Sequence, residues 1–194
     1  MCVFQFERRN LDELLQSELA QEEAACAAGD SRPQDPFDSS RKMFEYIKES
    51  VGRCSAYSNG QTLSSLGMEF RICLNQYAES LSFRCPTPIP PSKPGGPVQY
   101  SVSDVQEITL CRVIKTGEYC ADVIPQLESL MRNKIRSSMA SEVDFNINID
   151  KFHDLCSKTI QILVVSVINR LEIPFKAMRR INWGSVETLG ETSE

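Results

Sequence analysis

The sequence predicts an all-α fold, in the form of an elongated antiparallel helical bundle. Apolar residues recur at helical spacing over most of the 194 residues, and no segment alternates with period two for long. Apolar residues make up 41% of the chain, which is enough to build a hydrophobic core. The expected core is therefore formed by apolar stripes on several helices and not by a sheet.

Residues 1–28 are predicted to form an acidic amphipathic helix. Leu11, Leu14, Leu15 and Leu19 recur at helical spacing among Glu and Gln, which favours a narrow apolar face. Its place in the fold stays open. The net charge of -5 is concentrated at this end of the chain, where acidic side chains outnumber basic ones by far. Residues 29–38 contain two prolines among turn residues and are predicted to be a linker.

Residues 39–85 are predicted to form a helical hairpin. One apolar stripe runs from Met43 to Cys54 in steps of three and four, and a second runs from Leu63 to Leu81. The two stripes are separated by a short Asn-Gly connection, which favours antiparallel packing of the two helices.

Residues 86–100 are predicted to be a proline-rich spacer. Six prolines and two glycines stand within this stretch, and such a composition cannot continue a helix. It is the strongest boundary signal in the sequence.

Residues 101–194 are predicted to form a helical bundle segment. Ser103, with Gln106 three residues on, fits a capping box that opens a long helix. Pro125 lies inside that helix and predicts a kink. Pro174 stands where a further helix is predicted to begin.

The widest apolar stripe lies over residues 152–171 and predicts a helix that packs on more than one neighbour. Just before it, Val143–Ile149 alternates weakly and is expected to be a loop that tucks its apolar side chains under the bundle. The residues expected to pack in the core at this end of the chain are Leu155, Ile160, Leu163, Val164, Val167 and Trp183.

No catalytic centre, cofactor site or metal site is expected. His153 is the single histidine, so a catalytic triad is improbable. His153 and Cys156 are three residues apart, but no second spaced pair completes a tetrahedral zinc site. The eight cysteines form no close pairs and are expected to be reduced thiols.

The composition also restricts the partners. A sequence pI near 5.1 without a dense run of Lys and Arg argues against nucleic acid. The most apolar run, Ile160–Ile168, is much shorter than the roughly 20 residues that span a bilayer. Any membrane contact is therefore expected to be peripheral, and the absence of a secretory pattern at the N-terminus predicts a cytosolic location.

Two sparse basic groups remain as candidate contacts for anionic lipid or for an acidic partner helix. An ordinary solvated helix face explains both groups more simply. They are Arg132, Lys134 and Arg136, and Lys176, Arg179 and Arg180.

The segment TGEYCADVIPQLESL at residues 116–130 resembles a helix of the vacuolar protein sorting-associated protein 53 family, in which Thr-x-Glu-Tyr-Cys is followed by Gln-Leu-Glu. SKTIQILV at 157–164 and W-x-x-V-E at 183–187 are similar to later segments of the family, and the likeness extends over roughly residues 38–194. The residues that carry the signature are Thr116, Glu118, Tyr119, Cys120, Gln126, Leu127 and Glu128.

The sequence departs from the family pattern in three places. Pro125 lies inside the signature helix, the spacer resembles an insertion, and residues 1–30 match nothing in the family. Family members are longer and carry an N-terminal coiled coil, so the chain resembles an internal fragment.

The resemblance implies a non-catalytic subunit of the Golgi-associated retrograde protein complex and of its endosome-associated sister complex. Such a subunit tethers vesicles in retrograde transport to the trans-Golgi network and in endosomal recycling. The implied partners are the other subunits, with SNARE proteins or small GTPases as further candidates. The implied location is the cytoplasmic face of the trans-Golgi network and endosomes, where the protein is peripheral.

Two other classes stay open from the residues alone. One is a free-standing helical adaptor that binds partner peptides or helices, and the other is an accessory regulator of a small GTPase. Neither class has a motif of its own in this sequence.

Overall fold

The computed structural model describes residues 3–28, 35–90 and 98–181. The predicted all-α class is confirmed, because the described residues form helices and no strand beyond one isolated bridge between Ile89 and Gln99. The elements in chain order are α1 (Val3–Ala27), α2 (Asp38–Tyr57), α3 (Gln61–Ser82), α4 (Asp104–Lys134), the short 3-10 helix η1 (Ser137–Glu142) and α5 (Asn146–Arg180).

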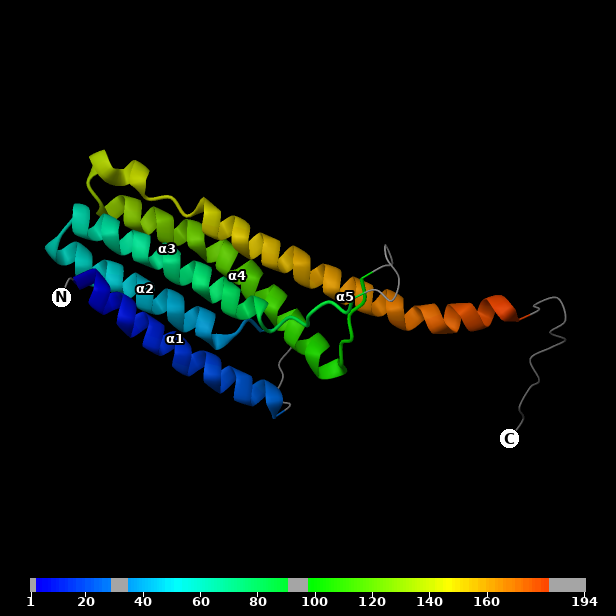
Figure 1. The fold of residues 1–194 in the computed structure, drawn as a ribbon. Helices are drawn as coiled ribbons and strands as arrows, with labels where there is room; N and C mark the ends of the chain where they lie inside the picture. The colour runs from blue at the N-terminus through cyan, green and yellow to red at the C-terminus, as the bar shows by residue number, and fades with distance from the viewer. Residues whose placement is uncertain (1–2, 29–34, 91–97, 182–194) are drawn as a thin grey trace, which may run out of the picture.

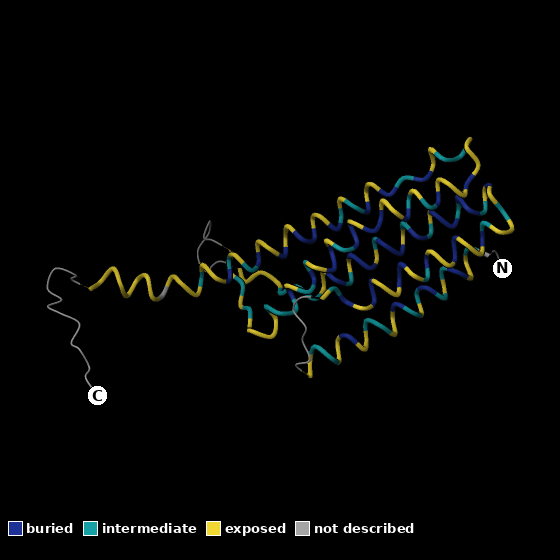
Figure 2. The backbone as a smooth tube through the Cα atoms, turned by 180° about the vertical axis from the view of Figure 1, so that it is seen from behind, coloured by how far each residue is buried: buried dark blue, intermediate teal, exposed yellow. Residues whose placement is uncertain are grey.

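The five long helices lie side by side in an elongated bundle (Figure 1). The apolar stripes face inward, so buried positions alternate with exposed ones at helical intervals along each helix (Figure 2). The last part of α5 extends past the end of the other helices (Figure 1). This extension is the most exposed part of the helical structure.

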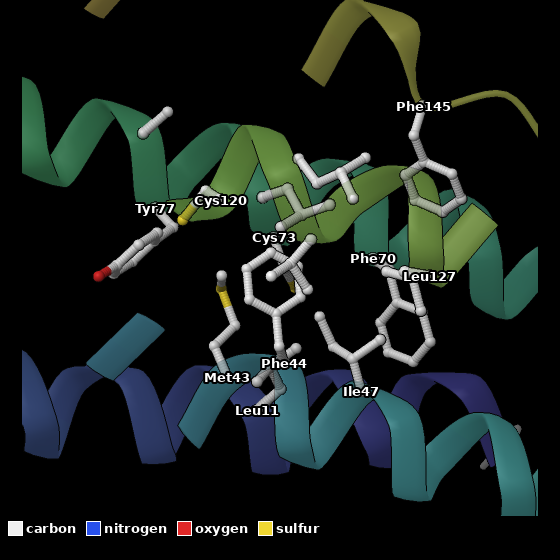
Figure 3. Packing of buried hydrophobic residues seen from close by; sticks show 14 of the residues in the cluster. Leu11, Met43, Phe44, Ile47, Phe70, Cys73, Tyr77, Cys120, Leu127 and Phe145 are labelled. Atoms are coloured by element: carbon white, nitrogen blue, oxygen red, sulfur yellow. The ribbon is translucent and has the colours of Figure 1, made fainter. Parts of the chain in front are cut away.

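A single core unites the helices on both sides of the proline-rich spacer. Figure 3 shows Phe44 and Ile47 of α2 facing Phe70 of α3 and Leu127 of α4, with Leu11 of α1 nearby. All five side chains are almost fully buried. The strong composition boundary at the spacer therefore does not divide the molecule into two cores.

Helix α1 packs against α2 and α3 and is held there by ion pairs as well as by its leucines. Glu7 accepts hydrogen bonds from Tyr46 Oη at 2.7 Å and from Arg53 Nη2 at 2.8 Å. Arg8 Nη1 donates to Glu69 Oε2 at 2.6 Å. The acidic character of the first segment thus serves its docking onto the hairpin.

Phe37 joins α1, α3 and α4 at the start of α2. The guanidinium carbons of Arg84 and Arg112 lie 4.1 and 4.3 Å from the centre of its buried ring. Arg84 Nη2 also donates to Glu22 Oε2 at 2.9 Å, and Glu22 Oε1 accepts from the backbone N–H of Ser39. These contacts fix the entry of the chain into the hairpin.

Helix α4 begins with the predicted capping box. The Ser103 hydroxyl accepts from the Gln106 N–H, and the Gln106 side chain accepts from the Ser103 N–H at 2.9 Å. The helix continues from Asp104 to Lys134 with Pro125 inside it.

Helix α5 begins earlier than the sequence predicts, inside the segment 143–149 that was expected to be a loop. Val143 and Phe145 are buried in a short loop, as expected, but the helix already begins at Asn146. Arg132 donates to the Val143 carbonyl, at 2.9 Å from Nη2, and this bond holds the loop against α4.

The prediction that a new helix begins at Pro174 is wrong. Helix α5 is continuous from Asn146 to Arg180, and Pro174 lies inside it. Proline keeps a helical φ angle and loses one backbone hydrogen bond. Here Arg170 and the two residues after it are exposed to water, so the Arg170 carbonyl, which loses this bond, can be solvated.

Candidate interaction surface

Helix α5 carries two apolar faces. The face that packs into the bundle contains Phe152, Leu155, Cys156, Thr159 and Ile162, all of them buried. The Thr159 hydroxyl is satisfied within the helix, because it donates to the Leu155 carbonyl at 2.7 Å. Further along, this face continues through buried Ser166, so its apolar character fades as α5 approaches the end of the bundle.

The second face is exposed and is here called the α5 stripe. Its members recur three or four residues apart over nearly twenty residues and are therefore aligned along one side of the helix. Each exposes between 43% and 59% of its surface. The α5 stripe consists of Ile160, Val164, Val167, Ile168, Leu171, Phe175 and Met178.

The predicted burial of Ile160, Val164 and Val167 within this chain is corrected by these exposures. Leu155 is buried and Leu163 is half-buried, while Trp183 lies outside the described residues. The sequence pattern predicts one wide buried stripe, whereas only one of the two apolar sides of α5 packs into the bundle.

The end of α5 stands clear of the bundle. Every described side chain from Arg170 to Ile181 is exposed. An isolated helix of this length is marginal in water, because nucleation is costly. This one continues a helix that is already anchored by its first half, so it needs no nucleus of its own.

A shallow hollow of about 230 Å³ lies on the α5 stripe in this extension. Lys176 Nζ pairs with Glu172 Oε1 at 2.6 Å along one edge of it. The hollow is therefore apolar at its base and charged along one rim. Its lining residues are Ile168, Leu171, Glu172, Phe175, Lys176 and Arg179.

The signature residues of α4 do not converge on one site. Thr116 and Cys120 are buried, and the Thr116 hydroxyl accepts from the Phe37 N–H at 2.9 Å. Tyr119 is half-buried and meets the edge of Phe44, with ring centres 6.0 Å apart. Thr116 and Tyr119 thus link α4 to the first part of α2, whereas Cys120 lies beside Tyr77 of α3 (Figure 3).

The remaining signature residues divide between the core, the surface and the loop before α5. Leu127 is fully buried, whereas Glu118 and Gln126 are exposed. Glu128 accepts the N–H of Phe145 at 3.0 Å and thereby holds the loop that leads into α5. The signature therefore consists mainly of packing residues.

The histidine and cysteine side chains, which are the usual catalytic groups, are dispersed over the molecule. His153 is exposed on α5, and the described residues hold no cluster of three His, Cys, Asp or Glu side chains able to bind a metal ion. Burial, together with the nearby Asp12 carboxylate, raises the pKa of the Cys73 thiol to about 12. Burial also raises the pKa of Cys120 well above its usual range, so neither thiol is a thiolate nucleophile at neutral pH.

Across residues 3–28, 35–90 and 98–181, no helix combines the length and apolar character needed to cross a bilayer.

The fold and the α5 stripe define an elongated all-helical packing module with a protruding, partly apolar helix. The chain is 28% identical over 190 residues to vacuolar protein sorting-associated protein 53 A of Arabidopsis thaliana. This match covers 96% of the chain and 23% of the Arabidopsis protein. It is 22% identical over 170 residues to the vacuolar protein sorting-associated protein 53 homolog of Caenorhabditis elegans. This second match covers 81% of the chain and 21% of the Caenorhabditis elegans protein.

The chain is therefore a homologue of a segment of vacuolar protein sorting-associated protein 53, as the signature residues predict. The expectation that residues 1–30 match nothing in the family is wrong, because the match to the Arabidopsis relative covers 96% of the chain. It spans under a quarter of the length of these two curated relatives. No family model matches the chain. No solved structure matches it either.

Proposed function

We propose that the chain is a non-catalytic, structural segment of a vesicle-tethering subunit. The observation that carries this proposal is the similarity to the Arabidopsis relative along 96% of the chain. The elongated bundle agrees with such a role, because packed helices in series give reach without chemistry. The exposed α5 stripe adds a surface through which the segment binds other helices.

In this proposal the protein acts in retrograde transport from endosomes to the trans-Golgi network and in endosomal recycling. Its partners are the other subunits of the tethering complex, with SNARE proteins and small GTPases as further contacts. It is located peripherally on the cytoplasmic face of the trans-Golgi network and endosomes.

A second candidate is a free-standing helical adaptor. The observation that favours it is again the α5 stripe, since an adaptor needs a solvent-exposed apolar surface for its peptide or helix. The adaptor and the tether differ in what binds: an adaptor takes separate peptides, whereas a tethering subunit assembles with other long helical subunits.

Affinity purification of the tagged full-length protein from its own cells distinguishes the two. We expect other helical tethering subunits to be recovered in stoichiometric amounts from cytosol and from peripheral-membrane extracts. Imaging of the same tag should place the protein on Golgi and endosomal membranes. A protein recovered as a monomer and located away from these membranes would exclude the tethering role and leave the adaptor.

A further inference from the structure

We propose that the α5 stripe binds an acidic amphipathic helix of a partner protein. The partner helix would lie along the extension of α5 and place its own apolar residues over Ile168, Leu171 and Phe175. This inference deepens the proposed function, because it states the chemistry of the helix that assembly must supply.

The spacing of the stripe favours a helix as its occupant. Val164, Ile168, Leu171, Phe175 and Met178 follow one another by four, three, four and three residues. This is the spacing of a helix–helix seam, in which each side chain fits between residues of the facing helix. The seam is about 21 Å long at 1.5 Å per residue, which corresponds to nearly four turns of a partner helix.

The position of the stripe leaves room for such a helix. Because every described side chain from Arg170 to Ile181 is exposed, the extension is open on both flanks of the seam. Nearer the bundle, Ile160 and Val164 remain exposed although α5 lies against α4 there. A partner helix can therefore follow the stripe from the bundle onto the extension without displacing a helix of this chain.

The charge around the seam favours an acidic partner. Glu172 is neutralised by Lys176, and Arg170 by Glu107 of α4. Arg179 lines the hollow on the stripe and forms no ion pair within the described residues, whereas Arg180 lies on the far side of the helix from the seam. The C-terminal end of a helix carries a partial charge of roughly -0.5, which the full charge of Arg179 outweighs. The rim of the docking surface is thus positive.

Two other occupants fit less well. A second copy of this chain would bring the same positive rim to the seam and would add no complementary charge. An anionic membrane would attract Arg179 and Arg180, but it would repel a chain whose net charge is -5. A helix with acidic flanks satisfies both the apolar seam and its rim.

The test selects the partner chemistry directly. A display library of helical peptides carries Leu or Ile at the seam positions and random Glu, Gln or Lys at the flanking positions. The full 194-residue chain is the bait. We expect the selected peptides to be enriched in Glu, and affinity to fall as the salt concentration rises.

Three variants connect this binding to the stripe. Phe175→Asp should weaken the selected peptide at least about tenfold, because it places a charge in the centre of the seam. Arg179→Glu should also weaken it and should shift the selection toward Lys. Met68→Asp is the matched control, since Met68 is exposed to the same extent on α3. We expect it to leave binding unchanged.

Each alternative gives a different result. Selection without a preference for Glu, or no selection at all, overturns the proposal. The membrane becomes the occupant if the chain binds vesicles of phosphatidylcholine with phosphatidylserine and Phe175→Asp abolishes that binding while peptides are ignored. Self-association in sedimentation experiments that Phe175→Asp abolishes assigns the stripe to a second copy. These readouts use purified chain, so they are independent of which complex the protein joins in cells.

Discussion

Arg170 on α5 donates a hydrogen bond through Nη2 to Oε1 of Glu107, near the start of α4. The pair lies where α5 leaves the bundle, and the Arg170 side chain is half exposed. An exposed ion pair contributes little free energy, because water screens the charges and two long side chains lose freedom. The anchoring of α5 therefore comes from the apolar face before this point.

The first prediction concerns this pair. We expect Arg170→Ala to change the free energy of unfolding by less than about 0.5 kcal/mol. Urea unfolding of the chain, followed by circular dichroism, measures it. A loss well above 1 kcal/mol would mean that the pair is required to hold α5 against α4.

The second prediction concerns the core. Leu127 is fully buried among the side chains of α2, α3 and α4, so Leu127→Ala should cost about 2–5 kcal/mol through lost contacts and a residual cavity. Leu171→Ala on the exposed stripe is the matched control and should change stability by less than about 0.5 kcal/mol. Similar losses for both substitutions would contradict the burial pattern of α5.

The third prediction concerns the contact between α4 and α5. A Cβ atom added at Gly117 would lie 2.5 Å from Sγ of Cys156 and 3.5 Å from the Phe152 carbonyl oxygen. Gly117→Ala should therefore destabilise the fold by about 1–3 kcal/mol, despite the better helix propensity of alanine.

The same substitution should behave differently when the sulfur is absent. In a Cys156→Ala background, Gly117→Ala should be neutral or stabilising, because the closest atom has been removed. Calorimetry of the two single variants and the double variant gives the coupling. Strict additivity would show that the two helices do not approach as closely as described.

The fourth prediction concerns pH. Burial alone would raise the pKa of Glu7, but hydrogen bonds from Arg53 and Tyr46 outweigh burial and hold it below its ordinary value of 4.5. A carboxyl group with a lowered pKa contributes stability that is complete above the unfolded value and is lost as pH falls through the folded value. Glu7→Gln should therefore be destabilising near pH 7, by about 1–2 kcal/mol.

The difference between Glu7→Gln and the original chain should narrow below pH 4.5, as Glu7 becomes protonated. Urea unfolding at a series of pH values measures both proteins under the same conditions. A difference that stays constant down to the pH at which the fold is lost would contradict the role of this charge.

Helical periodicity was sufficient to predict the fold class and the inward faces of α2 and α3. The stripe from Met43 to Cys54 is buried as the spacing indicates, because its residues share one face of α2. The docking of α1 was not predictable in this way. Its ion pairs join residues far apart in sequence, such as Glu7 and Arg53, and periodicity carries no information on such pairs.

The sequence identifies the residues of the α5 stripe as an aligned apolar set, but it does not predict that they are exposed. A sequence pattern marks Ile160, Val164 and Val167 as apolar and aligned, but it does not indicate whether this chain or another one covers them. Pro174 was misassigned for a related reason, since its effect depends on whether the preceding turn is packed or solvated. Both errors fall on exposed parts of α5.

The continuity of α5 has a mechanical consequence. At 1.5 Å per residue, its 35 residues form one helix about 52 Å in contour length, which packs on the bundle along its first half and changes direction where it leaves the bundle (Figure 1). A force applied to the unpacked end of such a helix acts as a torque on the part that is packed against the bundle. A partner that pulls on the extension would therefore turn α5 against α4 at the close contact between Gly117 and Cys156.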